Sequence, residues 1–490
     1  MSCFPNLFSR KARIQEDVSI LPPAYSSLEH APSVQLSREK SNKQVFFGRI
    51  VHSKSLKDLE IFNKAALGVD ESGAIHFLDD KVGSAAEACK KYSGFEQAAC
   101  TTLKPLQFLF PGMIDTHMHA PQWPNMAIGM EGNLKEWVEN YTDPLEASYK
   151  DNDKARRVYD EMVQKELENG STTVAYNSSP HYQATNILAD MCLKYGQRAI
   201  IGKLCIDRNA THGNVEVSTT QSLEDEEKAV AHIRKIDPEA KLLSPCIQPR
   251  SLGFDSPELV AGLGKMCYPK TQSSPIHVQA HMCETIADFK QAQKVHPGFE
   301  NYSEIYDHYG MLHEKTILAH CIYLSDRDID LLVARKSGVA HNGNSNTCLT
   351  DGECRVRELL NRGVKVGLGT DCSAGYGISI LDSMRSASNV SRHLVIHKGD
   401  PSLKLSFEEI VFLGTMGGAQ VCDMQDKIGN FEPGKQFDAL VVDVGLKDNI
   451  NISGWEHDDL ALVKKWVFMG DDRSIRLVYV NGKLVAGKDR

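Results

Sequence analysis

The sequence predicts an α/β protein, a (β/α)8 TIM-type barrel with a small β-sandwich domain formed from the N- and C-terminal segments. Three observations lead to this fold. Apolar strand-like runs alternate with helical runs in the middle of the chain, strand-rich segments flank that middle on both sides, and polar residues follow the apolar runs. We expect a disordered tail at 1–43, the small β-domain at 44–108 plus 425–490, and the catalytic barrel at 109–424.

The first 43 residues are rich in Ser, Pro, Lys and Arg and show no sustained hydrophobic period. This composition is typical of a disordered tail. The tail contains a PPAY run that begins at Pro22 and ends at Tyr25. A PPxY run can dock in a WW domain as a polyproline II segment, although matches of four residues also arise by chance.

Short strands are expected on both sides of the middle region. Residues 44–53 (QVFFGRIVHS) and 65–80 (AALGVDESGAIHFLDD) have the pattern of β-structure, with a turn at residues 70–73. Near the C-terminus the runs with this pattern are FDALVVDV, WVFMG and IRLVYVNGKLVAG, the last with a turn at Asn481 and Gly482. We therefore expect one small β-domain built from both ends of the chain.

The middle of the chain alternates between apolar runs and helical runs. The runs expected as barrel strands are PGMIDTHMH, STTVAYNSS, RAIIGKLCID, LLSPCIQPR, IHVQAHMCE, TILAHCIYL, GVAHNGNS and VKVGLGTDCS. Helical runs such as ARRVYDEMVQKELENG, DEEKAVAHIRKI and DRDIDLLVARKSG lie between them, and several end in Gly, as helices often do. The units span residues 111 to about 400, which fits the size of a TIM barrel.

The composition narrows the class of protein. Hydrophobic residues make up 41% and charged residues 24% of the 490 residues, an ordinary globular mixture. The net charge of −9 argues against a nucleic-acid-binding protein, because such binding needs a basic surface. The 13 cysteines include no CxxC pair, which favours buried thiols in a reducing compartment. No apolar stretch approaches the roughly 20 residues that cross a bilayer, so we expect a cytoplasmic protein without membrane contact.

Polar residues end several of the expected strands, at the rim where TIM-barrel active sites lie. His117 and His119 are two residues apart, so a β-strand would point both imidazoles to one side. Two converging imidazoles suit a divalent metal such as zinc, but two histidines at a strand end can also lack a ligand. The later strand ends carry Arg250, His281 with Glu284 three residues on, His320, His341 and Asp371. Taken singly, His341 fits a hydrogen-bonded core histidine and Arg250 a structural ion-pair partner.

As a set, three imidazoles and a carboxylate leave one coordination position open for water, which is the arrangement of a catalytic zinc site. The expected ligands are His117, His119, His281 and Asp371. Two-metal barrels of this design usually bridge their ions with a modified lysine on the fourth strand. Here that strand, KLLSPCIQPR, has its only lysine at the start, so we expect one metal ion.

Several longer motifs carry a family resemblance. They are PGMIDTHMHAPQ, HVQAHMCE, ILAHC and VGLGTD, supported by LKEWVENYTDPLE, GSTTVAYN, GECRVRELL, MGGAQVCDM and GKQFDALVVD. Over residues 44–490 the chain resembles the amidohydrolase superfamily, and within it the guanine deaminases. The resemblance implies hydrolysis of the purine base guanine to xanthine and ammonia, a step of purine catabolism, by a homodimer with one zinc ion per subunit.

The resemblance also implies a role for each matching residue. The zinc ligands would be His117, His119, His281 and Asp371. The catalytic residues would be Glu284, Asp371 and His320, with His320 near the attacking water. The substrate-binding residues would be His119, Gln122, Arg250, Ser251, His281 and Asp371.

The chain departs from the family pattern near the base-binding pocket. Ser251 stands where an aromatic residue usually follows the arginine, Asp143 stands where Phe is common, and HNGNSN, with Asn342 and Gly343, replaces the frequent HCPxSN. Two alternatives to guanine deamination therefore stay open. One is a deaminase or chlorohydrolase acting on another aminated heterocycle, and the other is a catalytically silent scaffold with the same fold. A cytidine-deaminase site is excluded, because its H-x-E and P-C-x-x-C signature is absent.

Overall fold

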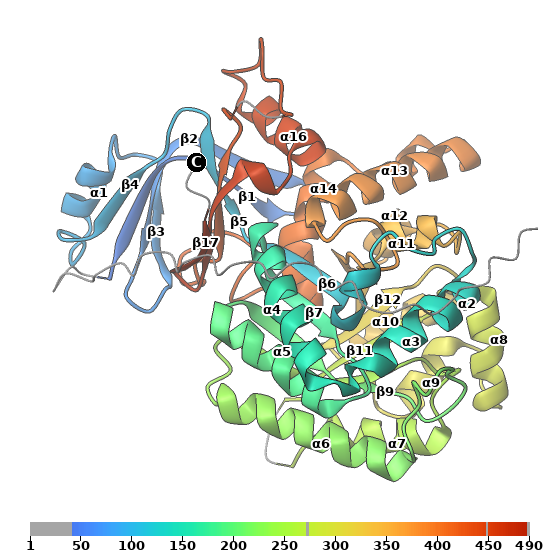
Figure 1. Cartoon of the computed structure of the whole chain (residues 1–490). Coiled ribbons are helices and arrows are strands. Elements are labelled where there is room, and N and C mark those ends of the chain that lie inside the picture. The colour runs from blue at the N-terminus through green and yellow to red at the C-terminus, as the bar shows by residue number, and fades with distance from the viewer. Residues whose placement is uncertain (1–41, 271–273, 447–448, 488–490) are drawn as a thin grey trace, which may run out of the picture. The chain divides into compact units, whose positions relative to one another are not determined.

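The computed structural model describes residues 42–270, 274–446 and 449–487. Two sheets organise this part of the chain (Figure 1). The PPAY run and most of the expected tail lie outside the described residues, so the predictions for them stay untested. None of the described helices is long and apolar enough to cross a membrane.

The central sheet is parallel and forms the expected barrel. Its strands, in spatial order, are β6 (Met113–His119), β7 (Ser171–Asn177), β8 (Arg198–Gly202), β10 (Leu243–Pro249), β11 (His277–Met282), β12 (Thr316–His320), β13 (Gly338–His341) and β14 (Lys365–Leu368), with β9 (Leu204–Cys205) paired to β10. The first and last strands meet, because the Thr116 hydroxyl donates to the Leu368 carbonyl over 2.9 Å. The sheet is therefore a nearly closed barrel, which confirms the predicted fold class.

Helices after the strands cover the outside of the barrel (Figure 1). They are α4 (Asn152–Glu168), α5 (Tyr182–Tyr195), α6 (Thr219–Ile236), α7 (Pro257–Met266), α8 (Ile286–Val295), α9 (Tyr302–His308), α10 (Asp326–Arg335), α11 (Gly343–Cys348), α12 (Val356–Asn361) and α13 (Ile380–Lys398). Local chemistry sets their ends. The Asp151 carboxylate accepts from the first backbone N–H groups of α4, and α5 stops at Gly196, whose φ of 74° suits glycine. Two further helices, α14 (Phe407–Phe412) and α15 (Gly418–Val421), follow α13.

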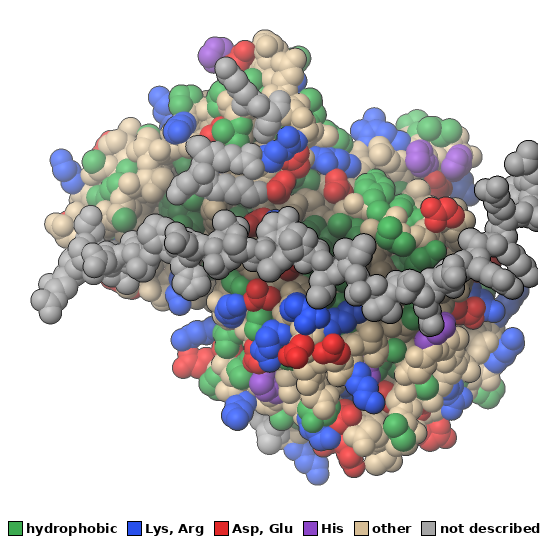
Figure 2. All heavy atoms as spheres, in the orientation of Figure 1, with side chains coloured by type: hydrophobic (Ala, Val, Ile, Leu, Met, Phe, Trp, Pro, Cys, Tyr) green, Lys and Arg blue, Asp and Glu red, His purple; other side chains and the backbone are tan. Residues whose placement is uncertain are grey.

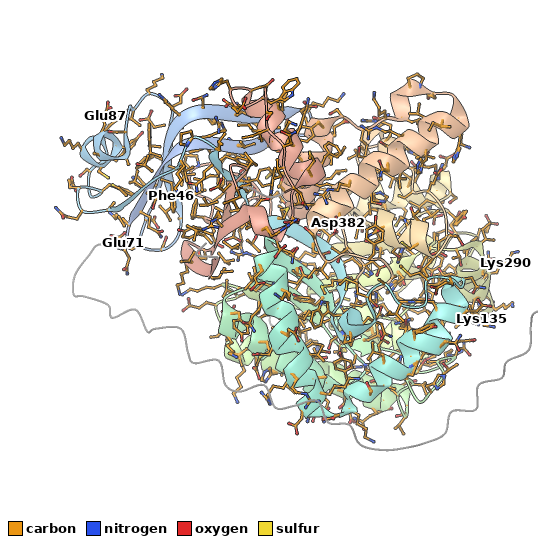
Figure 3. The ribbon with its side chains drawn as sticks, turned by 45° about the horizontal axis from the view of Figure 1, so that its top comes forward. Phe46, Glu71, Glu87, Lys135, Lys290 and Asp382 are labelled. Carbon is orange, nitrogen blue, oxygen red and sulfur yellow. The ribbon has the colours of Figure 1, made fainter. Side chains whose placement is uncertain are left out.

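The second sheet combines both ends of the described chain. Its strands run in the order β17 (Lys483–Gly487), β16 (Ile475–Val480), β15 (Ala439–Asp443), β5 (Gln107–Pro111), β1 (Gln44–Ser55), β2 (Asp58–Val69) and β3 (Ile75–Asp79), and β4 (Ala99–Thr102) pairs with β1. Phe46 of the N-terminal part stacks on Phe437 of the C-terminal part, with ring centroids 4.9 Å apart. Figure 3 shows Phe46 inside this sheet region, with Glu71 and the α1 (Ala85–Lys91) residue Glu87 at its margin. The small β-domain built from both termini is confirmed.

One expected strand is a helix. All of the run WVFMG except its final Gly470 belongs to α16 (Asp459–Met469). This helix begins after Asp458, whose carboxylate accepts from the Ala461 N–H. Leu462, Val463, Trp466 and Val467 are buried, and the spacing of these residues matches a helix rather than a strand. The five-residue window at 466–470 was too short to show this period.

A buried ion pair joins the barrel to the small sheet. The guanidinium of Arg198, at the start of β8, donates to both carboxylate oxygens of Asp438 over 3.1 Å. Asp438 also accepts from the backbone N–H of Asn481 at 2.7 Å, in the turn between β16 and β17. The Asp438 carboxylate therefore accepts hydrogen bonds from both the barrel and the small sheet. On the face that Figure 2 shows, basic and acidic side chains of the described residues are interspersed.

Candidate metal and active site

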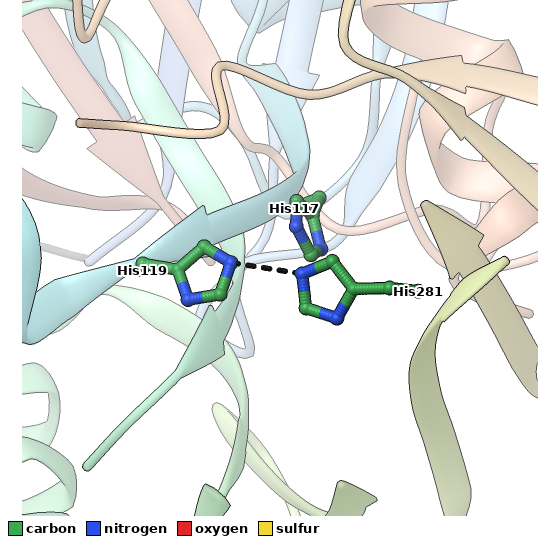
Figure 4. Close-up of side chains that lie close together, drawn as sticks. All are labelled: His117, His119 and His281. Carbon is green, nitrogen blue, oxygen red and sulfur yellow. Dashed lines mark hydrogen bonds between the residues drawn. The ribbon is translucent and has the colours of Figure 1, made fainter. Parts of the chain in front are cut away.

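Three histidines meet at the C-terminal ends of the barrel strands (Figure 4). His117 and His119 end β6, and His281 lies near the end of β11. The Nε2 atoms of His119 and His281 are 3.1 Å apart, and one ring nitrogen from each of the three histidines lies within 4.8 Å of the others. The spacing of two residues on a strand thus brings both β6 imidazoles to one point, as expected.

Asp371 completes the group. It follows β14, the last barrel strand, which lies next to β6. One of its carboxylate oxygens, Oδ1, lies 3.2 Å from Nε2 of His117 and 3.4 Å from Nε2 of His119. His320, at the end of β12, has its Nε2 3.7 Å from the other oxygen of Asp371. The structure therefore brings together all four residues expected to bind a metal, with His320 beside them.

The hydrogen bonds of the histidines show that the group fits a cation. Nδ1 of His281 lies 2.8 Å from the carbonyl oxygen of Arg250, and Nδ1 of His117 lies 2.5 Å from Oε1 of Gln279. Both oxygens only accept, so each Nδ1 carries a hydrogen and each Nε2 presents a lone pair. Two lone pairs and a carboxylate that meet at one buried point repel each other unless a cation lies among them. The donor set suits a divalent ion that takes nitrogen and oxygen ligands, such as zinc.

The ionisation states agree with this fit. Burial is the main effect that holds the pKa of His119 and of His281 well below the ordinary value of histidine. Burial alone would raise the pKa of Asp371, but the neighbouring imidazoles, that of His117 first, hold it well below the usual range. Neutral imidazoles and an ionised carboxylate are the states in which these side chains bind a metal.

Two buried side chains support this group. Asp115 accepts from the backbone N–H groups of His117 and Thr370 at 3.0 and 3.1 Å, which ties β6 to the segment that carries Asp371. Gln279 orients His117 through the contact described above, and it also accepts from the Asn177 amide over 2.9 Å. Sequence reasoning gave neither residue a role. Gln279 lies two positions before His281 on the same strand, so the alternation of strand side chains could have revealed it.

Glu284 stands beside the imidazole of His320. Its Oε1 lies 3.5 Å from Nε2 of His320, whose Nδ1 lies 2.8 Å from Oδ1 of Asn346. Burial, with the neighbouring charge of Asp371, raises the pKa of Glu284 well above the ordinary value of a glutamate. A carboxyl group whose pKa is raised keeps its proton more readily than an ordinary glutamate, and a side chain that holds and passes on a proton is what general acid–base catalysis needs.

A cavity of about 660 Å³ opens onto these residues. Its lining includes every residue expected to contact substrate or act in catalysis: His119, Gln122, Arg250, Ser251, His281, Glu284, His320 and Asp371. Residues of α2 (Leu134–Trp137) and of the start of α8 form part of its wall. Figure 3 labels Lys135 on α2 and Lys290 on α8 near each other. His341 is buried but belongs to neither group of metal-ligating side chains.

An unexpected carboxylate lies behind the two residues expected to hold a base. Glu146, in α3 (Asp143–Ala147), accepts from Nε2 of Gln122 over 2.7 Å and faces the Arg250 guanidinium at 3.4 Å. Burial raises its pKa, and the charge of Arg250 opposes that effect. The segment 134–147 has no hydrophobic period that would mark Glu146 as a site residue. Its neighbour Asp143 accepts from the N–H and hydroxyl of Thr211, each over 2.8 Å.

Ser251 occupies the cavity wall where the family pattern has an aromatic ring. Its hydroxyl donates to Oδ1 of Asp288 over 3.2 Å. The nearby ring of Phe254 lies with its centroid 6.0 Å from the guanidinium carbon of Arg250. The cavity therefore has polar groups at position 251, and an aromatic ring reaches Arg250 from a different position in the chain.

Comparisons with known proteins agree with this geometry. Residues 108–485 match the model of the amidohydrolase family. The chain is 39% identical to a probable guanine deaminase of Schizosaccharomyces pombe, over 90% of this chain and 83% of that protein. It is 35% identical to the guanine deaminase of Homo sapiens, over 90% and 96% of the two chains. A guanine deaminase from C. acetobutylicum, solved with guanine in its active site, superimposes with a TM-score of 0.81 at 30% identity, over 90% of this chain and 99% of that one.

Proposed function

This chain belongs to the amidohydrolase family, and from that premise we propose that it hydrolyses guanine to xanthine and ammonia with one zinc ion per subunit. One observation carries the proposal. The expected metal ligands His117, His119, His281 and Asp371 converge beside Glu284, in a cavity that Gln122 and Arg250 also line. The guanine deaminases to which the chain is similar, one of them solved with guanine bound, support guanine as the substrate.

The chemistry follows from the side chains. Attack on an aromatic C–NH2 carbon needs hydroxide at neutral pH. A zinc ion held by His117, His119, His281 and Asp371 would supply it by lowering the pKa of its water to about 7. Asp371 accepts the proton of the attacking water, and His320 orients that water through its Nε2. Glu284 delivers a proton to the ring nitrogen beside the attacked carbon, so negative charge does not build up there. Asp371 then passes the proton it took from water to the amine, which leaves as ammonia. The new hydroxyl group gives its proton to Glu284 as the carbonyl of xanthine forms, so both carboxyl groups return to their starting states.

Gln122 and Arg250 hold the base in this proposal. The guanidinium of Arg250 offers only donors, so it pairs with an acceptor such as a ring carbonyl. The amide of Gln122 has a donor and an acceptor and can pair with ring nitrogens. Ser251, His119, His281 and Asp371 line the same cavity, and in this proposal they also contact the base. A site built to hydrogen-bond one edge of a purine strongly rejects analogues that lack that edge.

The deciding experiment measures xanthine formation from guanine together with zinc content on the same purified sample. We expect turnover of guanine and close to one zinc ion per chain. Near-stoichiometric zinc without turnover of any amine would favour the silent scaffold. If the sample released ammonia or chloride from another heterocycle faster than ammonia from guanine, that heterocycle would replace guanine as the proposed substrate.

Four further properties belong to the same proposal. We infer a homodimer in the cytoplasm, with the barrel at 109–424 and the small β-domain at 44–108 plus 425–490. The segment from Pro22 to Tyr25 is proposed to bind a WW domain. Light scattering of the purified chain tests the dimer, and titration of a WW domain with a peptide of the PPAY segment, against its Tyr25→Ala form, tests the last point.

A further inference from the structure

Glu146 is fully buried, and the proposed reaction gives it no role. Its Oε1 accepts from Nε2 of Gln122 over 2.7 Å, and its Oε2 accepts from Nδ2 of Asn214 over 2.9 Å. Nη1 of Arg250 lies 3.4 Å from both oxygens. Each of these neighbours is a donor, so the carboxylate accepts from every one of them. It is thus the common partner of both residues that hold the base.

This arrangement fixes the direction of the Gln122 amide. A carboxylate cannot donate, so Gln122 must turn its NH2 group toward Glu146. Its Oε1 is then buried and has no hydrogen-bond partner among the described residues, while Gln122 lines the cavity. A buried carbonyl oxygen is costly to leave unpaired. The substrate is the remaining source of a donor for it.

We propose that Glu146 is a positioning residue that makes Gln122 accept from a ring N–H while Arg250 donates to the adjacent ring carbonyl. The inference rests on the proposed function and names the edge of the base that Gln122 and Arg250 recognise. A 6-oxopurine such as guanine presents N1–H next to C6=O. In 2,6-diaminopurine N1 carries no hydrogen and C6 carries an amino group, so both pairings are reversed. The site therefore selects 6-oxopurines against 6-aminopurines by mismatched polarity.

An isosteric substitution that removes the charge, and a double variant that restores it, test this assignment. Glu146→Gln lets residue 146 donate, so the Gln122 amide can turn over. We expect kcat/KM for guanine to fall roughly tenfold to a hundredfold, mostly through KM, and the preference for guanine over 2,6-diaminopurine to shrink. In the double variant Glu146→Gln with Gln122→Glu, the new amide donates to the new carboxylate, whose other oxygen is again an acceptor. We expect this pair to regain at least about tenfold of the loss, together with the preference.

The controls separate positioning from folding and metal binding. Oε1 of Glu146 also lies 3.9 Å from Nδ1 of His119, so zinc content and thermal midpoint are measured for each variant. Glu224→Gln, at an exposed position of α6, is the matched control and should behave as wild type. If Glu146→Gln left the ratio of kcat/KM for guanine to that for 2,6-diaminopurine unchanged, the proposal would be wrong. If wild type did not turn over guanine, the proposed function would fail. The ratio of the two dissociation constants in wild type and in Glu146→Gln, measured by calorimetry, would then decide the role of Glu146.

Discussion

Oε1 of Glu284 lies 3.5 Å from Nε2 of His320, and the same imidazole nitrogen lies 3.7 Å from Oδ2 of Asp371. Two carboxyl groups whose pKa values are shifted in opposite directions therefore lie beside one histidine. Burial raises the pKa of Glu284, whereas the surrounding imidazoles hold the pKa of Asp371 down against the effect of burial. Environments that separate two acids in this way allow one to keep a proton that the other has given up.

Replacement of Glu284 by glutamine tests its role in proton transfer. The amide keeps the size and polarity of the carboxyl group but cannot exchange a proton. We expect kcat for guanine to fall by at least about a hundredfold, which is the usual range for loss of a general acid–base group. Zinc content should stay that of wild type, because Glu284 is not among the side chains that converge as metal ligands. Steady-state kinetics with metal analysis of the same preparation measures both, and near-normal turnover would remove Glu284 from the mechanism.

Loss of the Asp371 carboxylate should abolish metal binding and activity together. Asp371 supplies the negative charge closest to the imidazoles of His117 and His119, so we expect Asp371→Ala to retain little zinc and no measurable turnover. In wild type, removal of the metal by a chelator should lower the thermal midpoint, and added zinc should restore it. A ligand at 100 to 1,000 times its Kd stabilises the folded state by about 3–4 kcal/mol. A midpoint for Asp371→Ala that rose with zinc as much as that of wild type would contradict the assignment.

The sequence predicted the barrel and its metal group because both follow from short, regular rules. Alternating strand and helix patterns predict the barrel, and the position of a polar residue at a strand end predicts where its side chain lies. His281 and Asp371 are far apart in sequence, yet the rim of a closed barrel brings strand ends together. The same rules predicted the small domain from both ends of the chain.

Features that depend on long-range contacts were not predictable. Glu146 reaches Gln122 and Arg250 because the segment 134–147 folds back over the strand ends, and no pattern within that segment encodes this path. The pattern at 466–470 predicts a strand, whereas these residues lie at the end of the helix at 459–469. A five-residue apolar window does not distinguish the period of a helix from that of a strand. Packing against the rest of the fold decides such cases.

The buried ion pair between Arg198 and Asp438 should contribute to stability without affecting the chemistry. Asp438→Ala leaves a buried guanidinium whose remaining contacts among the described residues are to the Lys241 carbonyl and the Gln436 amide oxygen. Removal of one partner of a buried pair typically costs about 3–5 kcal/mol, so we expect a markedly lower thermal midpoint. Asp307→Ala, which breaks the exposed pair with Arg335, is the matched control and should cost at most about 1 kcal/mol. Equal midpoints for the two variants, or loss of zinc in Asp438→Ala at low temperature, would contradict this account.

Glu226 should make stability depend on pH at a position on α6. Burial raises its pKa to about 8, although the nearby charge of Lys203 opposes that effect. The thiol of Cys205 contacts its Oε2 over 3.5 Å. In the unfolded chain a glutamate has a pKa of about 4.3, so between these values the folded state holds a proton that the unfolded state has lost. Unfolding then releases a proton, and stability falls as the pH rises through this window and levels off above pH 8.

Glu226→Gln isolates this contribution, because the amide mimics the protonated carboxyl group and does not titrate. We expect the variant and wild type to have similar thermal midpoints near pH 5. As the pH rises toward 8 the variant should become the more stable of the two, by at most about 5 kcal/mol. Midpoints measured at half-unit steps from pH 5 to 8.5 follow the difference directly, and the other titrating groups cancel in it. A constant difference across this range would show that Glu226 is ionised in the folded protein and that Lys203 outweighs the effect of burial.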